Sequence, residues 1–201
     1  MKRTTLAPWA EPAPGARFPM SAGDLLLLPG DSWRYELVEG RLVRMPPPGG
    51  GHGYITLEIA ATLRAFVKAH NLGVVLSSET GFLLSQLGQP DTVLAPDVSF
   101  VRAEHVPALD GPQWAVYWRV APDLVAEVVS PSQFRPEMAE KARLWLESGA
   151  RLVWIVWPRD RQVDVWLPGH DEPIATLGTS DQLDGRDVLP GFTYPLADLF
   201  A

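Results

Sequence analysis

Residues 121–133 read APDLVAEVVSPSQ, and this stretch limits the folds open to the chain. Its apolar run from Leu124 to Val129 is typical of a strand that is covered on both faces, yet Glu127 lies in the middle of that run. A buried carboxylate costs several kcal/mol unless it is paired, bound to a metal or protonated. We therefore expect the fold to bring a partner for Glu127 from elsewhere in the chain.

The composition limits the class of protein. The chain has 201 residues, of which 46% are hydrophobic, and this is enough for one well-buried core. It contains no cysteine, so a metal would have to be held by oxygen or imidazole ligands. No apolar run approaches the ~20 residues that span a bilayer, and the first residues lack the apolar segment of a signal peptide. We expect a cytoplasmic protein without membrane contact.

The net charge of −7 argues against a protein that coats nucleic acid without regard to sequence, because neutralising phosphates needs an excess of Lys and Arg. An acidic nuclease remains compatible with this charge if it holds DNA through metal ions and a few clustered arginines. Arg34, Arg41 and Arg44 lie close together in the sequence, as do Arg151, Arg159 and Arg161. Solvated charges at strand edges explain both groups equally well.

The order of predicted elements indicates a domain of the α/β class. Residues 1–20 are rich in proline and are predicted to form a flexible arm, and residues 21–201 to form the domain. Apolar periodicity, turns and caps predict helices at 21–28, 52–70 and 136–148, hairpins over 34–45 and 151–167, strands at 74–78, 81–85 and 97–102, a loop over 87–96, and one or two strands over 114–130. This order predicts a mixed β-sheet flanked by α-helices, with additional β-hairpins.

Strand pairing suggests a partner for Glu127. If residues 97–102 pair antiparallel with residues 123–129, Asp97 and Glu127 lie side by side. Asp123 is a poorer partner, because it lies four residues from Glu127 along the same strand, about 13 Å away.

Two neighbouring carboxylates repel each other and need a proton, a lysine or a divalent cation between them. Lys141 is the candidate lysine, because it flanks the apolar face of the helix predicted at 136–148 and lies in its early turns. Asp97, Glu127 and Lys141 could then meet at one edge of the sheet. Such a trio suits metal-dependent hydrolysis of phosphodiesters, with the carboxylates holding Mg²⁺. A buried ion network with no catalytic role is the alternative.

Several segments together resemble a known family. They are YELVEGRLVRMPPP, His52, APDVSFV, PDLVAEVVSPS, EKARLWLESGARLVWIVWP and a late LPGF. In this order and spacing, from about Ser21 to the C-terminus, the chain resembles the Uma-two family of predicted restriction endonucleases. That family is assigned to the PD-(D/E)xK nuclease superfamily.

The resemblance implies roles for individual residues. Asp97 would be the acid of the Pro-Asp motif and Glu127 the second acid, and both would bind Mg²⁺ or Mn²⁺. The superfamily lysine would fall at position 129, which is Val129 here. In the Uma-type pattern the lysine lies instead on the following helix, where Lys141 matches it.

Glu36 and His52 also match the family pattern. Glu36 would be a further acid near the metal, unless it is a solvent-facing strand residue. His52 would bind a phosphate or relay a proton, although a lone histidine on an apolar face is more often just hydrogen-bonded in place. Glu79 is a weaker candidate and stays outside the predicted site.

The sequence thus predicts a restriction-endonuclease-like domain that hydrolyses DNA with Mg²⁺ or Mn²⁺. Its predicted catalytic residues are Asp97, Glu127, Lys141, Glu36 and His52. We expect a homodimer, because two sites related by a twofold axis are the simplest means of cutting both strands of a duplex. One alternative is an inactive nuclease scaffold that binds DNA or protein, and another is a metal-free hydrolase that uses the two carboxylates as acid and base.

Overall fold

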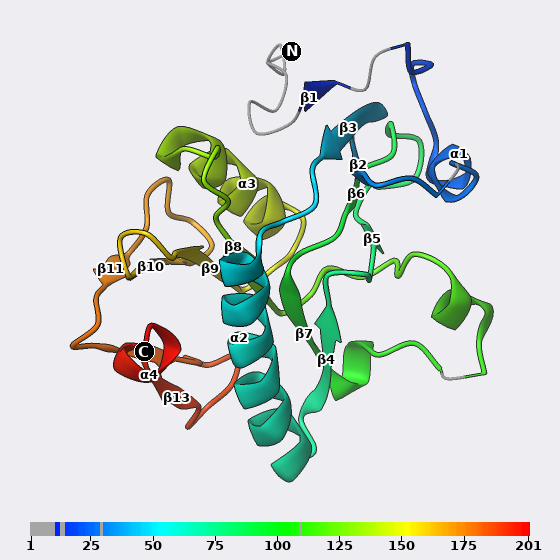
Figure 1. Ribbon diagram of the computed structural model, residues 1–201. Coiled ribbons are helices and arrows are strands. Elements are labelled where there is room, and N and C mark those ends of the chain that lie inside the picture. The colour runs from blue at the N-terminus through cyan, green and yellow to red at the C-terminus, as the bar shows by residue number, and fades with distance from the viewer. Residues whose placement is uncertain (1–10, 13–14, 29, 109) are drawn as a thin grey trace.

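A mixed six-stranded sheet forms the centre of the computed structural model, which describes residues 11–12, 15–28, 30–108 and 110–201 (Figure 1). The strand order is β11-β10-β9-β8-β7-β4. The strands are β4 Gly73–Ser77, β7 Val98–Arg102, β8 Leu124–Val128, β9 Leu152–Trp157, β10 Gln162–Trp166 and β11 Ala175–Leu177. Only β8 and β9 pair in parallel within this sheet. The predicted α/β class and mixed sheet are confirmed.

Helices cover both faces of this sheet, which explains the apolar run around Glu127. On one face, Ala126 and Val128 of β8 pack with Ile59 of α2 (Gly50–Ala69) in one core cluster. On the other face, Val125 packs with Met138 of α3 (Arg135–Glu147) in a second cluster. Side chains alternate along a strand, so Glu127 points to the face covered by α3.

A smaller five-stranded sheet lies beside the central sheet, with the order β1-β3-β2-β6-β5. Its strands are β1 Glu11–Pro12, β2 Arg34–Val38, β3 Arg41–Met45, β5 Phe82–Leu83 and β6 Val93–Leu94. The predicted hairpin over 34–45 is confirmed, and both residues of its turn, Glu39 and Gly40, have positive φ. The loop predicted over 87–96 was wrong in part, because β6 forms within it.

Short elements complete the described chain. They are α1 Ala22–Leu26, the 3-10 helices η1 Ala103–His105 and η2 Pro112–Ala115, β12 Gln182–Asp184, β13 Thr193–Pro195 and α4 Leu196–Leu199. Ser21 caps α1, because its side chain accepts a hydrogen bond from the backbone N–H of Asp24. The segment 114–130 carries one strand, β8, preceded by a single bridge from Trp118 to Phe82.

Most of the arm predicted over residues 1–20 lies outside the described residues. Within it, Glu11 and Pro12 pair with Arg44 and Val43 of β3. In the part of the chain that the structure describes, no helix has the length and apolar character needed to cross a membrane.

Candidate active site

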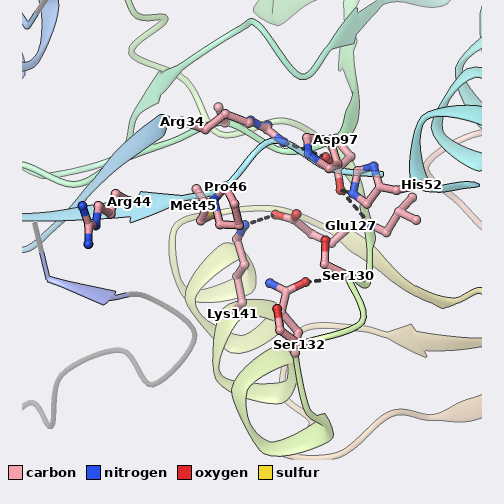
Figure 2. Close-up of a pocket in the computed structure, with 14 residues that line it drawn as sticks. Arg34, Arg44, Met45, Pro46, His52, Asp97, Glu127, Ser130, Ser132 and Lys141 are labelled. Atoms are coloured by element: carbon pink, nitrogen blue, oxygen red, sulfur yellow. Dashed lines mark hydrogen bonds and ion pairs between the residues drawn. The ribbon is translucent and has the colours of Figure 1, made fainter. Parts of the chain in front are cut away.

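The ends of β7 and β8 bring two acidic side chains together. These strands pair antiparallel with Val98 opposite Ala126, so Asp97 lies next to Glu127 as the sequence predicted. Both side chains are buried, and both line one cavity of about 220 Å³ (Figure 2). Asp123 lies at the other end of β8, where it accepts a hydrogen bond from the backbone N–H of Arg102.

Asp97 is held from three sides. The backbone N–H of Val128 donates to Oδ2 at 2.8 Å, and Nε2 of His52 lies 3.1 Å from the same oxygen. Nη1 of Arg34 donates to Oδ1 at 3.3 Å, and Figure 2 shows Arg34 and His52 on opposite sides of the carboxylate. Burial raises the pKa of Asp97. The hydrogen bonds and nearby charges, those of His52 first, outweigh burial and hold the pKa of Asp97 below its usual range. Asp97 is therefore an anion at neutral pH.

Glu127 receives two donors from α3. Nζ of Lys141 lies 3.0 Å from Oε1, and Nε1 of Trp145 donates to the same oxygen at 2.8 Å. Lys141 and Trp145 reach the same atom because residues four apart lie on one face of a helix. Burial raises the pKa of Glu127 to about 7, with Asp97 and Glu36 adding to this effect and Lys141 opposing it.

Glu36 connects the smaller sheet to this site. Its Oε1 accepts a hydrogen bond from the backbone N–H of Ala95 at 2.9 Å and lies 3.6 Å from Nζ of Lys141. Burial lowers the pKa of Lys141, but the charges of Glu127, Glu36 and Asp97 outweigh burial and raise it above its ordinary value. Lys141 is therefore a cation that is 3% exposed and surrounded by carboxylates.

Carboxyl groups outnumber amino groups in this cluster. Asp97, Glu127 and Glu36 face one buried ammonium, that of Lys141, while the imidazole of His52 contacts Asp97 and the guanidinium of Arg34 is partly exposed at the edge. Oε2 of Glu36 is buried and has no hydrogen-bond partner among the described residues. An excess of buried carboxylate oxygen favours the binding of a proton or a hard cation.

The cluster fits a cation that takes few ligands from the protein. Within the described ranges, no group of three or more His, Cys, Asp or Glu side chains is arranged to hold a metal ion. Mg²⁺ commonly binds through one or two carboxylates and completes its shell with water and substrate phosphate. Asp97 and Glu127 match this pattern, because they are adjacent carboxylates that line one cavity.

The structure thus gathers all five residues predicted from the sequence, Asp97, Glu127, Lys141, Glu36 and His52. The weaker candidate Glu79 lines other cavities.

The sequence reasoning missed two partners of the acids, Arg34 and Trp145. Trp145 lies one helical turn after Lys141, and this spacing was a usable signal. The contact of Arg34 with Asp97 joins the two sheets, and spacing along the chain gave no sign of it.

Comparisons with known proteins agree with this fold. The model of the Uma2 family, described as "Putative restriction endonuclease", matches residues 22–197. The chain is also similar to the crystal structure of a "putative nuclease belonging to DUF820" from Anabaena variabilis ATCC 29413. That similarity has a TM-score of 0.74 and 20% sequence identity, and it covers 90% of this chain and 98% of the other. It establishes a shared fold. The search of curated proteins gave no match.

Proposed function

Since this chain belongs to the Uma2 family, we propose that it is a nuclease that hydrolyses DNA phosphodiester bonds with the help of Mg²⁺ or Mn²⁺. The family and the nuclease-like fold support nuclease function in general. The metal, the DNA substrate and the roles of individual residues belong to the proposal. One observation carries it: two buried acids from adjacent strands and a buried lysine from α3 line the same cavity.

Asp97 and Glu127 would hold the cation. A bound Mg²⁺ or Mn²⁺ polarises a phosphoryl oxygen and makes a water molecule more acidic. The hydrogen bonds to Asp97 from Val128 and His52 leave its carboxylate little freedom to rotate. Glu127 is fixed in the same way by Lys141 and Trp145. Both carboxylates are therefore oriented before any ligand binds, which lowers the entropy cost of binding.

Lys141 and Arg34 supply positive charge on either side of the two acids. In hydrolysis the oxygen of water bonds to phosphorus, and the bond from phosphorus to one ester oxygen breaks. Negative charge builds up on the phosphoryl group during this step, and an ammonium in a cavity with little water stabilises it strongly. Lys141 lines the cavity and can orient the attacking water or contact the phosphate. Arg34 lines the same cavity and is more exposed, so it is suited to a phosphate oxygen.

The proposal predicts cleavage that depends on a divalent metal. Supercoiled plasmid and a labelled single-stranded oligonucleotide should both be cut with Mg²⁺ or Mn²⁺, and EDTA should abolish cutting in both assays. Adding the metal in excess of EDTA should restore the activity, which rules out irreversible damage to the protein. Cutting that persists in EDTA would contradict the metal role and favour the metal-free acid–base hydrolase. DNA binding without cutting under any metal condition would favour the inactive scaffold.

A second prediction concerns His52, whose role the sequence left open. We expect His52→Ala to raise the metal concentration for half-maximal cutting by about 10- to 100-fold, because groups that orient a metal ligand have effects of this size. The rate at saturating metal should fall less. His70→Ala is the matched control, because His70 is exposed at the other end of the same helix.

The prediction assumes that His52 acts by positioning the carboxylate of Asp97, and the opposite kinetic pattern would exclude that role. If His52→Ala leaves the metal requirement unchanged and lowers the rate at every metal concentration, His52 acts on the phosphate or on a proton. Metal titrations of the cutting rate for the three proteins therefore separate positioning of Asp97 from direct participation.

A homodimer remains part of the proposal, because cutting both strands of a duplex needs two sites or a reorientation of one. Trp114, Val116 and Leu26 are exposed and line one surface cavity away from the acids. This apolar area is available for contact with a second copy.

A further inference from the structure

The cavity that Asp97 and Glu127 line is called the acidic cavity from here on. A second cavity adjoins it and is lined mainly by apolar surface. Its volume is about 420 Å³, and it lies between the loop after β8, the start of α3 and the turn after β9. His52, Ser130 and Gln133 line both cavities, so the two are neighbours. We call this second cavity the flanking pocket. Its size falls within the range of sites that bind small organic ligands.

The flanking pocket presents an exposed aromatic ring. Phe134 lies at the start of α3, lines this pocket and is 64% exposed. Burying a phenylalanine side chain is favourable, so this exposed ring would gain free energy from a ligand that covers it. Trp157 lines the same pocket, and the guanidinium of Arg135 lies 4.5 Å from the centre of its ring. An exposed ring at the edge of an apolar cavity is suited to stacking against a flat ligand.

Polar groups at the pocket are arranged for a nucleotide. Oε1 of Gln133 accepts a hydrogen bond from the backbone N–H of Ser130 at 2.8 Å, which fixes the amide and leaves its NH₂ group to donate to a base. Arg159 lines the pocket, is exposed, and forms no ion pair with any other described residue. Its guanidinium can contact a backbone phosphate.

We infer that the flanking pocket binds an unpaired base of single-stranded DNA, next to the phosphate that occupies the acidic cavity. This inference rests on the proposed nuclease function and adds a substrate class to it. The base would stack on Phe134, while Gln133 donates to its edge. A base in a duplex is already paired and stacked, and it could enter the pocket only after the costly step of turning out of the helix. The chain should therefore prefer single strands, or duplexes with unpaired bases, over intact duplexes.

The test measures binding separately from cutting. In the Glu127→Gln protein, which should not cut, fluorescence anisotropy would give the Kd for a short single strand and for the same sequence as a duplex. We expect Phe134→Ala to weaken single-strand binding by about 5- to 150-fold, which is the effect of losing one stacked base. Duplex binding should change by less than about twofold. Phe134→Trp should keep the wild-type affinity, because it keeps a stacking ring.

Two further measurements sharpen the test. A 2-aminopurine base in the strand should lose fluorescence on binding, and this quenching should disappear with Phe134→Ala. Phe18→Ala is the matched control, because Phe18 is also an exposed ring, at 59%, and does not line either cavity. It should leave both affinities unchanged.

The possible outcomes separate this inference from the proposed function. If Phe134→Ala binds single strands as tightly as its parent, or loses affinity equally for duplexes, the inference is wrong even when the wild-type protein cuts DNA. If single-strand binding depends on Phe134 but the wild-type protein never cuts, the inference stands and the nuclease proposal fails.

Discussion

Glu127→Gln is expected to lower the rate of DNA cutting by about 10³-fold or more, which is about 4 kcal/mol in activation free energy. The substitution should leave the protein as stable as the wild type. Glutamine has the shape of glutamate, and its oxygen can still accept hydrogen bonds from Lys141 and Trp145. Only the negative charge is lost. A cation held between residues 97 and 127 would lose one of its two charged ligands.

The expected stability follows from the position of Glu127. Burial raises the pKa of this carboxyl to about 7, so keeping it ionised at neutral pH already costs free energy in the folded protein. Removing the charge therefore removes an unfavourable feature as well as an ion pair. Thermal unfolding of both proteins, measured beside their cutting rates, checks both parts of the prediction.

Asp123→Asn is the matched control for this experiment. Asp123 is as buried as Glu127 and lies just before the same strand, but it accepts from the backbone N–H of Arg102 and contacts His105 outside the acidic cavity. We expect it to lower Tm and to keep a cutting rate within about tenfold of the wild type. If Glu127→Gln cuts at nearly the wild-type rate, the acids and Lys141 form only a structural ion network.

Long and regular patterns explain why much of the fold could be predicted from the sequence. The apolar stripe of α2 and the two hairpins gave strong local signals, and the apolar run around Glu127 indicated a strand covered on both faces. In contrast, β6 and the elements after β11 have two to four residues each, too few for a period to emerge. They form because neighbouring strands and helices pack against them.

The residues of the candidate site also differ in whether a local sequence pattern could predict them. The pairing of Asp97 with Glu127 followed from strand register, and the position of Lys141 followed from helix periodicity. Glu36 and His52 came from the family resemblance, because nothing in their spacing connects them to Glu127. The contacts of Arg34 with Asp97 and of Glu36 with Lys141 join different sheets and helices, and only the packed structure reveals them.

The second large effect concerns stability. Lys141→Met should destabilise the protein by about 3–5 kcal/mol and lower Tm by about 6–20 °C, because it leaves two buried carboxylates without their ammonium partner. Methionine fills a similar volume, so loss of charge rather than loss of packing dominates the effect. Cutting should also fall sharply when it is assayed well below the unfolding temperature of the variant. Lys68→Met is the control, since Lys68 is exposed on α2, and it should change stability by less than about 0.5 kcal/mol.

The difference in stability between the wild type and Lys141→Met should depend on pH in a definite direction. Folding raises the pKa of Lys141 above its ordinary value of 10.5, so the stability that Lys141 contributes is fully present below that pH and is lost only in stronger alkali. Folding also raises the pKa of Glu127 from 4.5 to about 7, so the stability of the folded protein falls as pH rises between these values. Lys141 opposes that rise in pKa, so without Lys141 the fall in stability should continue to higher pH. The Tm gap between wild type and Lys141→Met should therefore widen from about pH 5 to about pH 8.

A double variant tests whether uncompensated charge is the cause. If the carboxylate of Glu127 is what destabilises Lys141→Met, then Glu127→Gln/Lys141→Met should regain at least about half of the lost Tm. It should remain unable to cut DNA, because both the proposed metal ligand and the ammonium are gone. A double variant as unstable as Lys141→Met would contradict the charge argument and point to a packing defect in α3. If the double variant regains stability but not cutting, Glu127 and Lys141 balance each other's charge in the folded protein. The fold then tolerates the loss of both groups together, whereas DNA cutting requires them.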